Sequence, residues 1–393
     1  MADGKIRYWL YQWLQRGKVL VVTIMAFIVL GVMLFFTYNF TFLSPVKKAV
    51  QEFSMTDIYY QILQETGKAD TSPLITIVDM TEMTSRRDLA QALEDIEACE
   101  PKIIGVDIIL EGRKEDTEGD NMIARVAANY PNIIWSMKLT DFIDDKIEYG
   151  NVIRSFFTDS LEVQEGVTNM QRRLYGGVKR RLDQGWILRG QLMPSFSTRV
   201  LNNYAGKTIY DTEIQSIDVN FTPTNFCVIN ADSVLMHPEL ITDRIVLFGA
   251  MNEEADMHYT PLGKIPGIVL LAYSIQTLLS QNQIVEVKGF ILWACSFILI
   301  MLTYWERVKR KKWIVHHAHP IVQLIIGFPI VSSIISFLWM ALALWLSFLL
   351  FCGYDISFNL GISFSAIAFL TTAEYSYLTL LDYLKLTDFN NEQ

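Results

Sequence analysis

Four segments of the chain are apolar enough and long enough to be membrane spans. The first, residues 19–40, contains the run VLVVTIMAFIVLGVMLFF without a charge, and a helix of this length crosses about 30 Å of hydrocarbon. A secretory signal peptide is the alternative, but the apolar run exceeds a signal h-region and no A-x-A-like cleavage site follows it. We therefore expect a retained anchor. The other three candidate spans are residues 287–305, 321–351 and 355–374.

The span at 321–351 is longer than the bilayer requires. A helix of this length has to tilt, kink at Pro329 or begin in the membrane interface. We predict that residues 321–351 form one span, because two spans made from them would each be too short.

Between the first and second spans, residues 41–286 alternate short apolar runs with amphipathic patterns. The runs lack polar alternation, which is typical of parallel strands covered by helices on both faces. The amphipathic patterns have the spacing of crossover helices. We predict an α/β domain with a mainly parallel sheet flanked by helices, inserted between one N-terminal and three C-terminal transmembrane helices. The predicted strands are 74–80, 102–110, 132–137 and 244–248, and the predicted helices are 86–98, 120–129 and 268–279. Residues 140–190 are polar and predicted to be irregular.

Lys and Arg near the spans predict the orientation of the chain, because positively charged flanks stay in the cytoplasm. Four basic residues precede the first span, and five lie in the segment 306–320. Residues 41–286 carry 22 Lys and Arg against 35 Asp and Glu, a net charge of −13. The segments 1–18, 306–320 and 375–393 are therefore predicted to be cytoplasmic, with the acidic domain outside. Anionic lipid headgroups account for the basic clusters, so the lipid bilayer is an expected partner and nucleic acid is not.

The composition agrees with a mixed membrane protein, since 51% of the residues are hydrophobic and the mean hydropathy is +0.25. The outer domain has two of the four cysteines, Cys99 and Cys227, and no spacing typical of a disulfide framework. A disulfide between them stays open as an alternative, and buried reduced thiols are favoured.

Five motifs in the outer domain follow one another in a recognisable order. They are I-x-I-V-D at 75–79, P-K-x-I-G-x-D at 101–107, D-S-V-L at 232–235, a strand ending in G-A at 244–250, and D-x-x-x-T-P-L-G-x-x-P-G at 256–267. This pattern resembles the CHASE2 family, an extracytoplasmic sensory domain of bacterial membrane receptors. One leading and three trailing spans also match the usual arrangement of those receptors. The resemblance implies a multi-pass protein of the bacterial inner membrane with its large domain in the periplasm.

The resemblance also implies a function. Family members detect a small-molecule or protein signal and commonly continue into an output enzyme, whereas here only 21 residues follow Thr372. This tail has no kinase glycine loop, phosphate loop or metal motif. We therefore expect a sensor whose signal leaves through a separate signalling or envelope protein, with a homodimer expected by analogy alone. The alternative is a structural or assembly subunit of a cell-envelope complex that uses the domain as a docking surface.

Two carboxylates are the first candidates for a ligand site. Asp79 and Asp107 lie near the carboxyl ends of predicted parallel strands, where open α/β sheets bind ligands. Glu82, Asp232 and Asp256 would complete an acidic pocket. The alternative is that these carboxylates cap helices or accept backbone N–H bonds in turns.

The TPLG and PG residues are predicted to form a loop that sets the direction of the following helix, and so couples the domain to the membrane. These residues are Thr260, Pro261, Leu262, Gly263, Pro266 and Gly267. The sequence predicts no catalytic residue, metal or cofactor. Asp79 faintly resembles a phosphoaspartyl nucleophile, but Thr81 stands where the second aspartate is needed, and no G-x-S-x-G elbow is present.

Overall fold

A computed structural model gives the structure of the protein and describes residues 11–39, 54–67, 69–170, 177–208, 216–280, 284–322 and 328–389. The first ten residues of the predicted cytoplasmic N-terminus lie outside this part of the chain. The chain divides into two compact units. One is Thr56–Ile284, and the other combines Met1–Met55 with Val285–Gln393.

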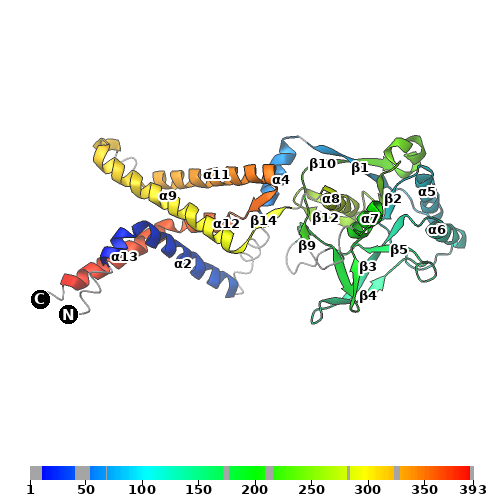
Figure 1. Ribbon diagram of the computed structural model, residues 1–393, viewed down its shortest axis with the longest axis horizontal. Helices are drawn as coiled ribbons and strands as arrows, with labels where there is room; N and C mark the ends of the chain where they lie inside the picture. The colour runs from blue at the N-terminus through cyan, green and yellow to red at the C-terminus, as the bar shows by residue number, and fades with distance from the viewer. Residues whose placement is uncertain are drawn as a thin grey trace. The chain divides into compact units, whose positions relative to one another are not determined.

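The first unit is built on a mixed sheet whose central strands are parallel (Figure 1). Its strand order is β10-β1-β11-β2-β3-β4-β7-β8, with β5 also paired to β3. The pairs from β10 to β3, and the pair of β3 with β5, are parallel. The strands are β1 Asp70–Asp79, β2 Ile103–Val106, β3 Ile133–Ile143, β4 Glu148–Ile153, β5 Gln164–Val167, β7 Gly185–Leu188, β8 Gln191–Pro194, β10 Thr224–Asn230 and β11 Ile245–Gly249. The prediction of a mainly parallel sheet flanked by helices is therefore confirmed.

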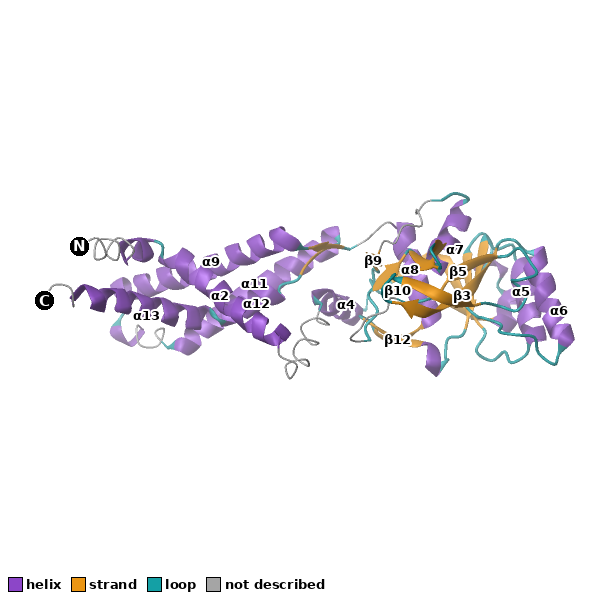
Figure 2. Ribbon diagram, turned by 90° about the horizontal axis from the view of Figure 1, so that it is seen from below, coloured by secondary structure: helices purple, strands orange, loops and turns teal. Residues whose placement is uncertain are grey.

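Helices cover both faces of this sheet. On one face α5 (Arg86–Ala98) and α6 (Thr117–Asn129) pack side by side (Figure 2). On the other face lie α7 (Phe196–Ala205) and α8 (Gly267–Ser280). Strand residues alternate between the two layers: Val78 packs with α5 and α6, whereas Ile75 and Ile77 pack with α7 and α8. The burial of both faces explains the unbroken apolar runs in the sequence.

Local signals in the sequence account for the ends of these helices. Ser85 caps α5, because its hydroxyl accepts a hydrogen bond of 3.1 Å from the backbone N–H of Asp88. Gly206 ends α7 in the left-handed conformation that glycine adopts without strain. The remaining described elements of this unit are α4 Met55–Glu65, β6 Arg181–Asp183, β9 Ser216–Asp218, the 3-10 turns Ala231–Met236, Pro238–Leu240 and Glu254–Asp256, β12 Met257–Thr260 and β13 Gly263–Pro266.

One expectation for this unit was wrong. Residues 140–190 are not irregular, because they contain the end of β3 and the strands β4 to β7. These strands are short and acquire their partners only in the folded sheet, so no periodic pattern marks them. The TPLG segment, predicted as a loop before the helix, is the turn of a β-hairpin formed by β12 and β13, and α8 begins at the residue after β13.

A buried ion pair joins α5 to α6. The Arg86 guanidinium donates to the Asp120 carboxylate, and the two side chains are 7% and 0% exposed. Arg86 also donates to the carbonyl of Gly112 at 2.8 Å, and Asp120 accepts from the backbone N–H of Lys114 at 2.9 Å. These bonds hold the loop that follows β2. The neighbouring pair, Arg87 with Asp116, is exposed.

The second unit consists mainly of long helices. Helices α2, α9, α12 and α13 share an apolar core, and α11 packs on α9 more lightly. β14 and β15 form a short parallel pair, so the segment before α9 is tied to the segment after α11. The elements are α2 Lys18–Asn39, β14 Val285–Val287, α9 Gly289–His317, α11 Pro329–Tyr354, β15 Ile356–Phe358, α12 Gly361–Ala368 and α13 Leu370–Phe389.

Three helices in the described residues are long and apolar enough to cross a membrane: Lys18–Thr37, Gly289–His317 and Ile330–Tyr354. The predicted segment 306–320 is not a loop throughout, because α9 continues to His317. Its Lys and Arg residues favour helix, and Arg310 pairs with Glu306 one turn earlier at 2.9 Å. The predicted third span begins as a helix at Pro329, a favoured first helical position.

The predicted fourth span, 355–374, is not one helix. Asp355 has a φ of +54° and ends α11, β15 follows, and a turn at Phe369 separates α12 from α13. Its crossing of the membrane stays a prediction. In the outer unit Cys99 is buried, Cys227 is partly buried, and both are free thiols.

Candidate functional site

Asp79 and Asp107 lie at the same edge of the sheet. Asp79 is the last residue of β1 and pairs in register with Gly249 of β11, and Asp107 follows Val106, which pairs with Phe248. Strand β11 lies between β1 and β2, although α5 connects those two strands in sequence. The order of the strands in the sheet therefore differs from their order in the sequence at this point. Open α/β sheets hold ligands at the carboxyl ends of strands where the order changes.

The Asp79 side chain has a structural role in a turn. One of its carboxylate oxygens accepts hydrogen bonds from the backbone N–H of Thr81 at 2.9 Å and from that of Met251 at 3.1 Å. The Thr81 hydroxyl donates to the same oxygen. Asp79 thus joins the turn after β1 to the turn after β11, which matches the capping alternative given for it above.

Asp107 and Asp256 line one cavity at this edge, with a volume of about 260 Å³. Three parts of the fold enclose it: the ends of β3 and β5, the β12–β13 hairpin with its preceding turn, and the first turns of α8. Besides the two aspartates, the lining residues are Lys138, Thr168, Asn169, Met170, His258, Gly267 and Leu271. The cavity brings acidic, basic and amide groups together beside a helix N-terminus.

The carboxylate of Asp256 occupies the place where any side chain at Gly267 would begin. A Cβ on Gly267 would lie 2.3 Å from Asp256 Oδ2 and 2.7 Å from Cγ and Oδ1. Asp256 therefore requires glycine at the first residue of α8. The negative charge also lies against the positive end of the helix, where it is stabilised. This contact gives a physical reason for the spacing of aspartate and glycine in the motif at 256–267.

Asp107 lines the cavity and is partly buried. Burial and the nearby negative charge of Asp256 raise the pKa of Asp107 to about 7, while His258 acts in the opposite direction. The His258 ring nitrogen Nε2 is 3.4 Å from Asp256 Oδ1. Asp107 is therefore only partly ionised near neutral pH, and its carboxyl group lies in the same cavity as that of Asp256.

Asn169 and Thr168 extend the sheet at the rim of the cavity. The Asn169 side chain accepts from the Leu139 N–H at 2.6 Å and donates to the Leu139 carbonyl at 2.9 Å. Thr168 N–H bonds to the Met137 carbonyl at 3.0 Å. The amide side chain thus fixes the middle of β3, next to Lys138. Lys138 lines the same cavity as the two carboxylates.

The hairpin next to the cavity is fixed by Thr260. Its hydroxyl accepts from the Leu262 N–H at 3.2 Å and donates to the Gly263 carbonyl at 3.0 Å. Pro261 and Leu262 form the two-residue turn, and Gly263 has a φ of +97°, which favours glycine. Pro266 is the last residue of β13, directly before α8. These residues hold the start of α8 relative to the cavity.

The other two predicted carboxylates lie elsewhere. Glu82 and Asp232 line a second cavity, of about 330 Å³, on the α5 side of the sheet. Asp88 and Asp95 of α5 also line it. The five carboxylates predicted as one pocket therefore divide between a turn and two cavities. In the described part of the chain, no group of three or more His, Cys, Asp or Glu residues is arranged to hold a metal ion.

Sequence reasoning missed Lys138, Asn169 and His258. His258 is two residues from Asp256 in the same motif, so the motif could have identified it as a residue of the cavity. Lys138 directly follows the predicted strand 132–137, and Asn169 lies in the region 140–190 that was expected to be irregular. The pairing of β3 with β2 brings Lys138 to the edge where Asp107 lies, and the pairing of β5 with β3 brings Asn169 there.

The fold and the cavity define a membrane-anchored α/β domain with a ligand-sized site at the carboxyl edge of its sheet. A family model described as the CHASE2 domain matches residues 23–305, from within α2 to within α9. Because this match covers more than half of the chain, the protein belongs to the CHASE2 family, and the resemblance of the five motifs is confirmed. CHASE2 is an extracytoplasmic sensory domain, so the protein has a sensory domain, and the three long apolar helices in the described residues are consistent with a membrane protein. No curated protein and no solved structure matches the chain.

Proposed function

We propose that the protein is a receptor of the bacterial inner membrane whose periplasmic domain binds a small cationic signal in the cavity of Asp107 and Asp256. The observation that carries this proposal is the position of the cavity. The cavity is lined by Asp107, whose pKa is raised, and by Gly267 and Leu271 in the first turns of α8. A cation bound there would favour the ionised form of Asp107 and relieve its repulsion from Asp256.

The route of the signal follows the chain. Residues 281–288 join the end of α8 to the start of α9, an apolar helix long enough to span a membrane. Within them, β14 is paired to β15, which lies between α11 and α12. A displacement of the segment after α8 therefore acts on two helices of the membrane unit. We propose that a separate protein, bound to these helices or to a homodimer of the chain, receives the signal.

Hydrogen exchange of the 393-residue chain in lipid vesicles tests the coupling. Asp107→Asn removes one of the two negative charges and so mimics occupancy by a cation. We expect slower exchange in α8 and also in residues 284–305. The control is Asp116→Asn, an exposed carboxyl group on the α6 side of the sheet, for which both segments should exchange as in the unchanged protein. A response confined to the cavity residues would show that the site does not communicate with the membrane helices.

Binding is tested with amines of increasing size, because the natural signal is unidentified. Methylammonium, putrescine and arginine would each be titrated against the chain in detergent, with the exchange rate of α8 as the readout. We expect protection by at least one of them and its loss in Asp256→Asn. If none protects α8, while a neutral or anionic solute does, the assignment of a cationic ligand is wrong.

Affinity purification from the native membrane separates the two classes of function. Recovery of the chain with a kinase, cyclase or transcription regulator agrees with a receptor that acts through a partner. Recovery with a stoichiometric envelope machine would instead favour a structural or assembly subunit. In that case the exchange experiment above should also show no coupling from Asp107 to the membrane helices.

A further inference from the structure

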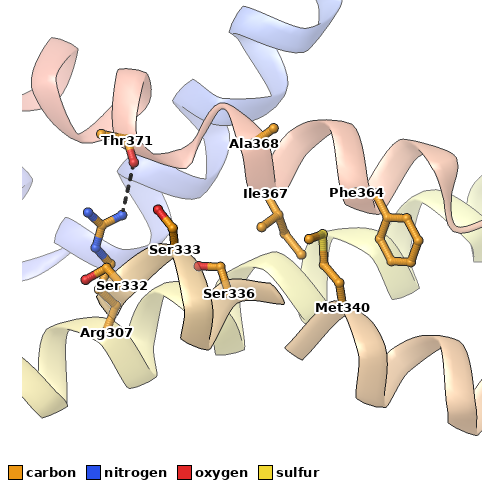
Figure 3. A pocket seen from close by; sticks show the side chains of 9 residues that line it. All are labelled: Arg307, Ser332, Ser333, Ser336, Met340, Phe364, Ile367, Ala368 and Thr371. Atoms are coloured by element: carbon orange, nitrogen blue, oxygen red, sulfur yellow. Dashed lines mark hydrogen bonds between the residues drawn. The ribbon is translucent and has the colours of Figure 1, made fainter. Parts of the chain in front are cut away.

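A third cavity, of about 200 Å³, lies within the membrane unit between α9, α11 and the α12–α13 segment (Figure 3). One end of it is polar and contains Arg307, Ser332, Ser333, Ser336 and Thr371. The sensory function does not account for a charged side chain inside a bundle of apolar helices. Such groups are costly in a membrane and mark binding sites or functional pathways.

The Arg307 guanidinium is the main polar group of this cavity. Its side chain is 13% exposed. One terminal nitrogen, Nη1, is 3.4 Å from the Thr371 hydroxyl, and Nη2 is 3.3 Å from a carboxylate oxygen of Glu374. Its Nε is buried and has no hydrogen-bond partner in the described part of the chain. The bond from Nη1 to Thr371 is longer than the roughly 2.7–3.2 Å typical of N–H···O bonds, so this nitrogen can donate to a ligand in the cavity instead.

The surrounding charge favours an anion. Lys18 and Lys311 also lie near Glu374, at 3.9 and 3.2 Å. With Arg307, three cations share one carboxylate, so the group has a net positive charge. Guanidinium groups bind phosphate through paired hydrogen bonds that a spherical ion cannot match.

The start of α11 adds to this preference. Phe328 precedes the helix and provides no side-chain cap. Ser332, Ser333 and Ser336 follow within the first turns, and their side chains line the polar end of the cavity (Figure 3). The positive end of a helix attracts anions, and hydroxyl groups add donors for phosphate oxygens.

The other end of the cavity is apolar. It is lined by Met340, Phe364 and Ile367, with Met340 eight residues beyond Ser332 on α11 (Figure 3). Eight residues of helix span about 12 Å. The occupant should therefore be charged at one end and apolar at the other. An inorganic anion would fill the polar end alone.

We propose that this cavity binds the phosphodiester headgroup of an anionic phospholipid, with the start of an acyl chain along Met340 and Phe364. The basic stretch of α9 from Arg307 to Lys312, with five Lys and Arg in six residues, places this end of the bundle at the cytoplasmic surface. Anionic headgroups are concentrated there, and basic pockets between membrane helices hold them.

Lipid retention measured by native mass spectrometry tests the site. The chain in detergent would be incubated with equimolar phosphatidylglycerol and phosphatidylcholine. We expect selective retention of phosphatidylglycerol, reduced about tenfold by Arg307→Gln through the loss of a charge-assisted hydrogen bond. Arg310→Gln is the matched control, because Arg310 has similar exposure, pairs with Glu306 and does not line the cavity.

A second variant keeps the test valid if Arg307→Gln fails to fold. Ser336→Leu fills the cavity without changing charge, and we expect it to reduce retention as well, whereas Ser376→Leu on the exposed face of α13 should not. Equal retention of phosphatidylglycerol by all variants would overturn the site. A competition with glycerol phosphate completes the test. If glycerol phosphate displaces the lipid at equal concentration, the site binds a soluble phosphate and the lipid assignment is wrong.

Discussion

The contact between Asp256 and Gly267 predicts that the effect of Gly267→Ala on stability depends on whether the Asp256 side chain is present. Gly267→Ala introduces a Cβ that would lie 2.3 Å from Asp256 Oδ2. The backbone at Gly267 is not in the left-handed region, so alanine is compatible with the local conformation. The Asp256 carboxylate has to move away from its place at the start of α8. We expect this substitution to loosen the first turns of the helix.

The magnitude follows from two opposing effects. The Cβ meets the far end of the Asp256 side chain, which is 43% exposed and can move away, so the cost is the loss of its interaction with the positive end of α8, about 0.3–1 kcal/mol at the surface and up to about 2 kcal/mol where it is partly buried. Alanine is favoured over glycine within a helix by up to about 1 kcal/mol, and by less at its first residue. The lost charge interaction is therefore the larger effect, and Gly267→Ala should be destabilising. In an Asp256→Ala background the clash is absent, so the same change should be neutral or stabilising. The two substitutions should be coupled by about 1 kcal/mol or more.

Hydrogen exchange of α8 in the 393-residue chain measures this coupling, since local opening free energies set the exchange rate. Exchange should be roughly tenfold faster for each 1.4 kcal/mol lost. Gly177→Ala serves as the control, because its Cβ would meet Tyr259 at an ordinary 3.7 Å. If Gly267→Ala destabilises α8 equally with and without Asp256, the contact does not explain the motif.

Three further predictions concern the outer domain. The pKa of Asp107 is raised to about 7. Its contribution to stability is therefore greatest below about pH 4 and is lost as the pH rises through 7. The melting temperature should fall over this range, and Asp107→Asn should make it less dependent on pH. Asp120→Ala leaves a buried arginine unpaired and should cost about 3 kcal/mol in denaturant unfolding, whereas Asp116→Ala, in the exposed pair, should change little. Gly166→Ala places a Cβ 2.5 Å from the Cα of Phe196, so α7 should lose its protection from exchange, and unchanged protection would contradict the packing described.

Much of the fold could be predicted because its determinants are local. The strands β2 and β11 and the second half of β1 are buried on both faces, and their sequences are nearly continuous apolar runs. Helix α5 was predicted at its observed bounds, since Ser85 provides a recognisable cap. Strand β5 shows the opposite case. Its sequence, QEGV, has no strand pattern, and it becomes a strand only through pairing with β3.

The candidate site was predicted less completely, for reasons of geometry. Sequence position indicates which residues follow strands, and both Asp79 and Asp107 do. It does not indicate whether a carboxylate turns back to the backbone, as that of Asp79 does, or faces a cavity, as that of Asp107 does. Which side of the sheet a residue faces also decides its neighbours, and this separates Glu82 and Asp232 from Asp256.

The motif at 256–267 combines two requirements in one short segment. Asp256 contributes a negative charge to the cavity, and the same carboxylate occupies the space in front of Gly267. A ligand that draws Asp256 toward Asp107 must therefore change the surroundings of the first residue of α8. The β12–β13 hairpin, fixed by Thr260, limits how far the intervening chain can absorb such a movement. The start of α8 is then the part left to respond, and the opposite end of the same helix precedes β14 and α9 along the chain.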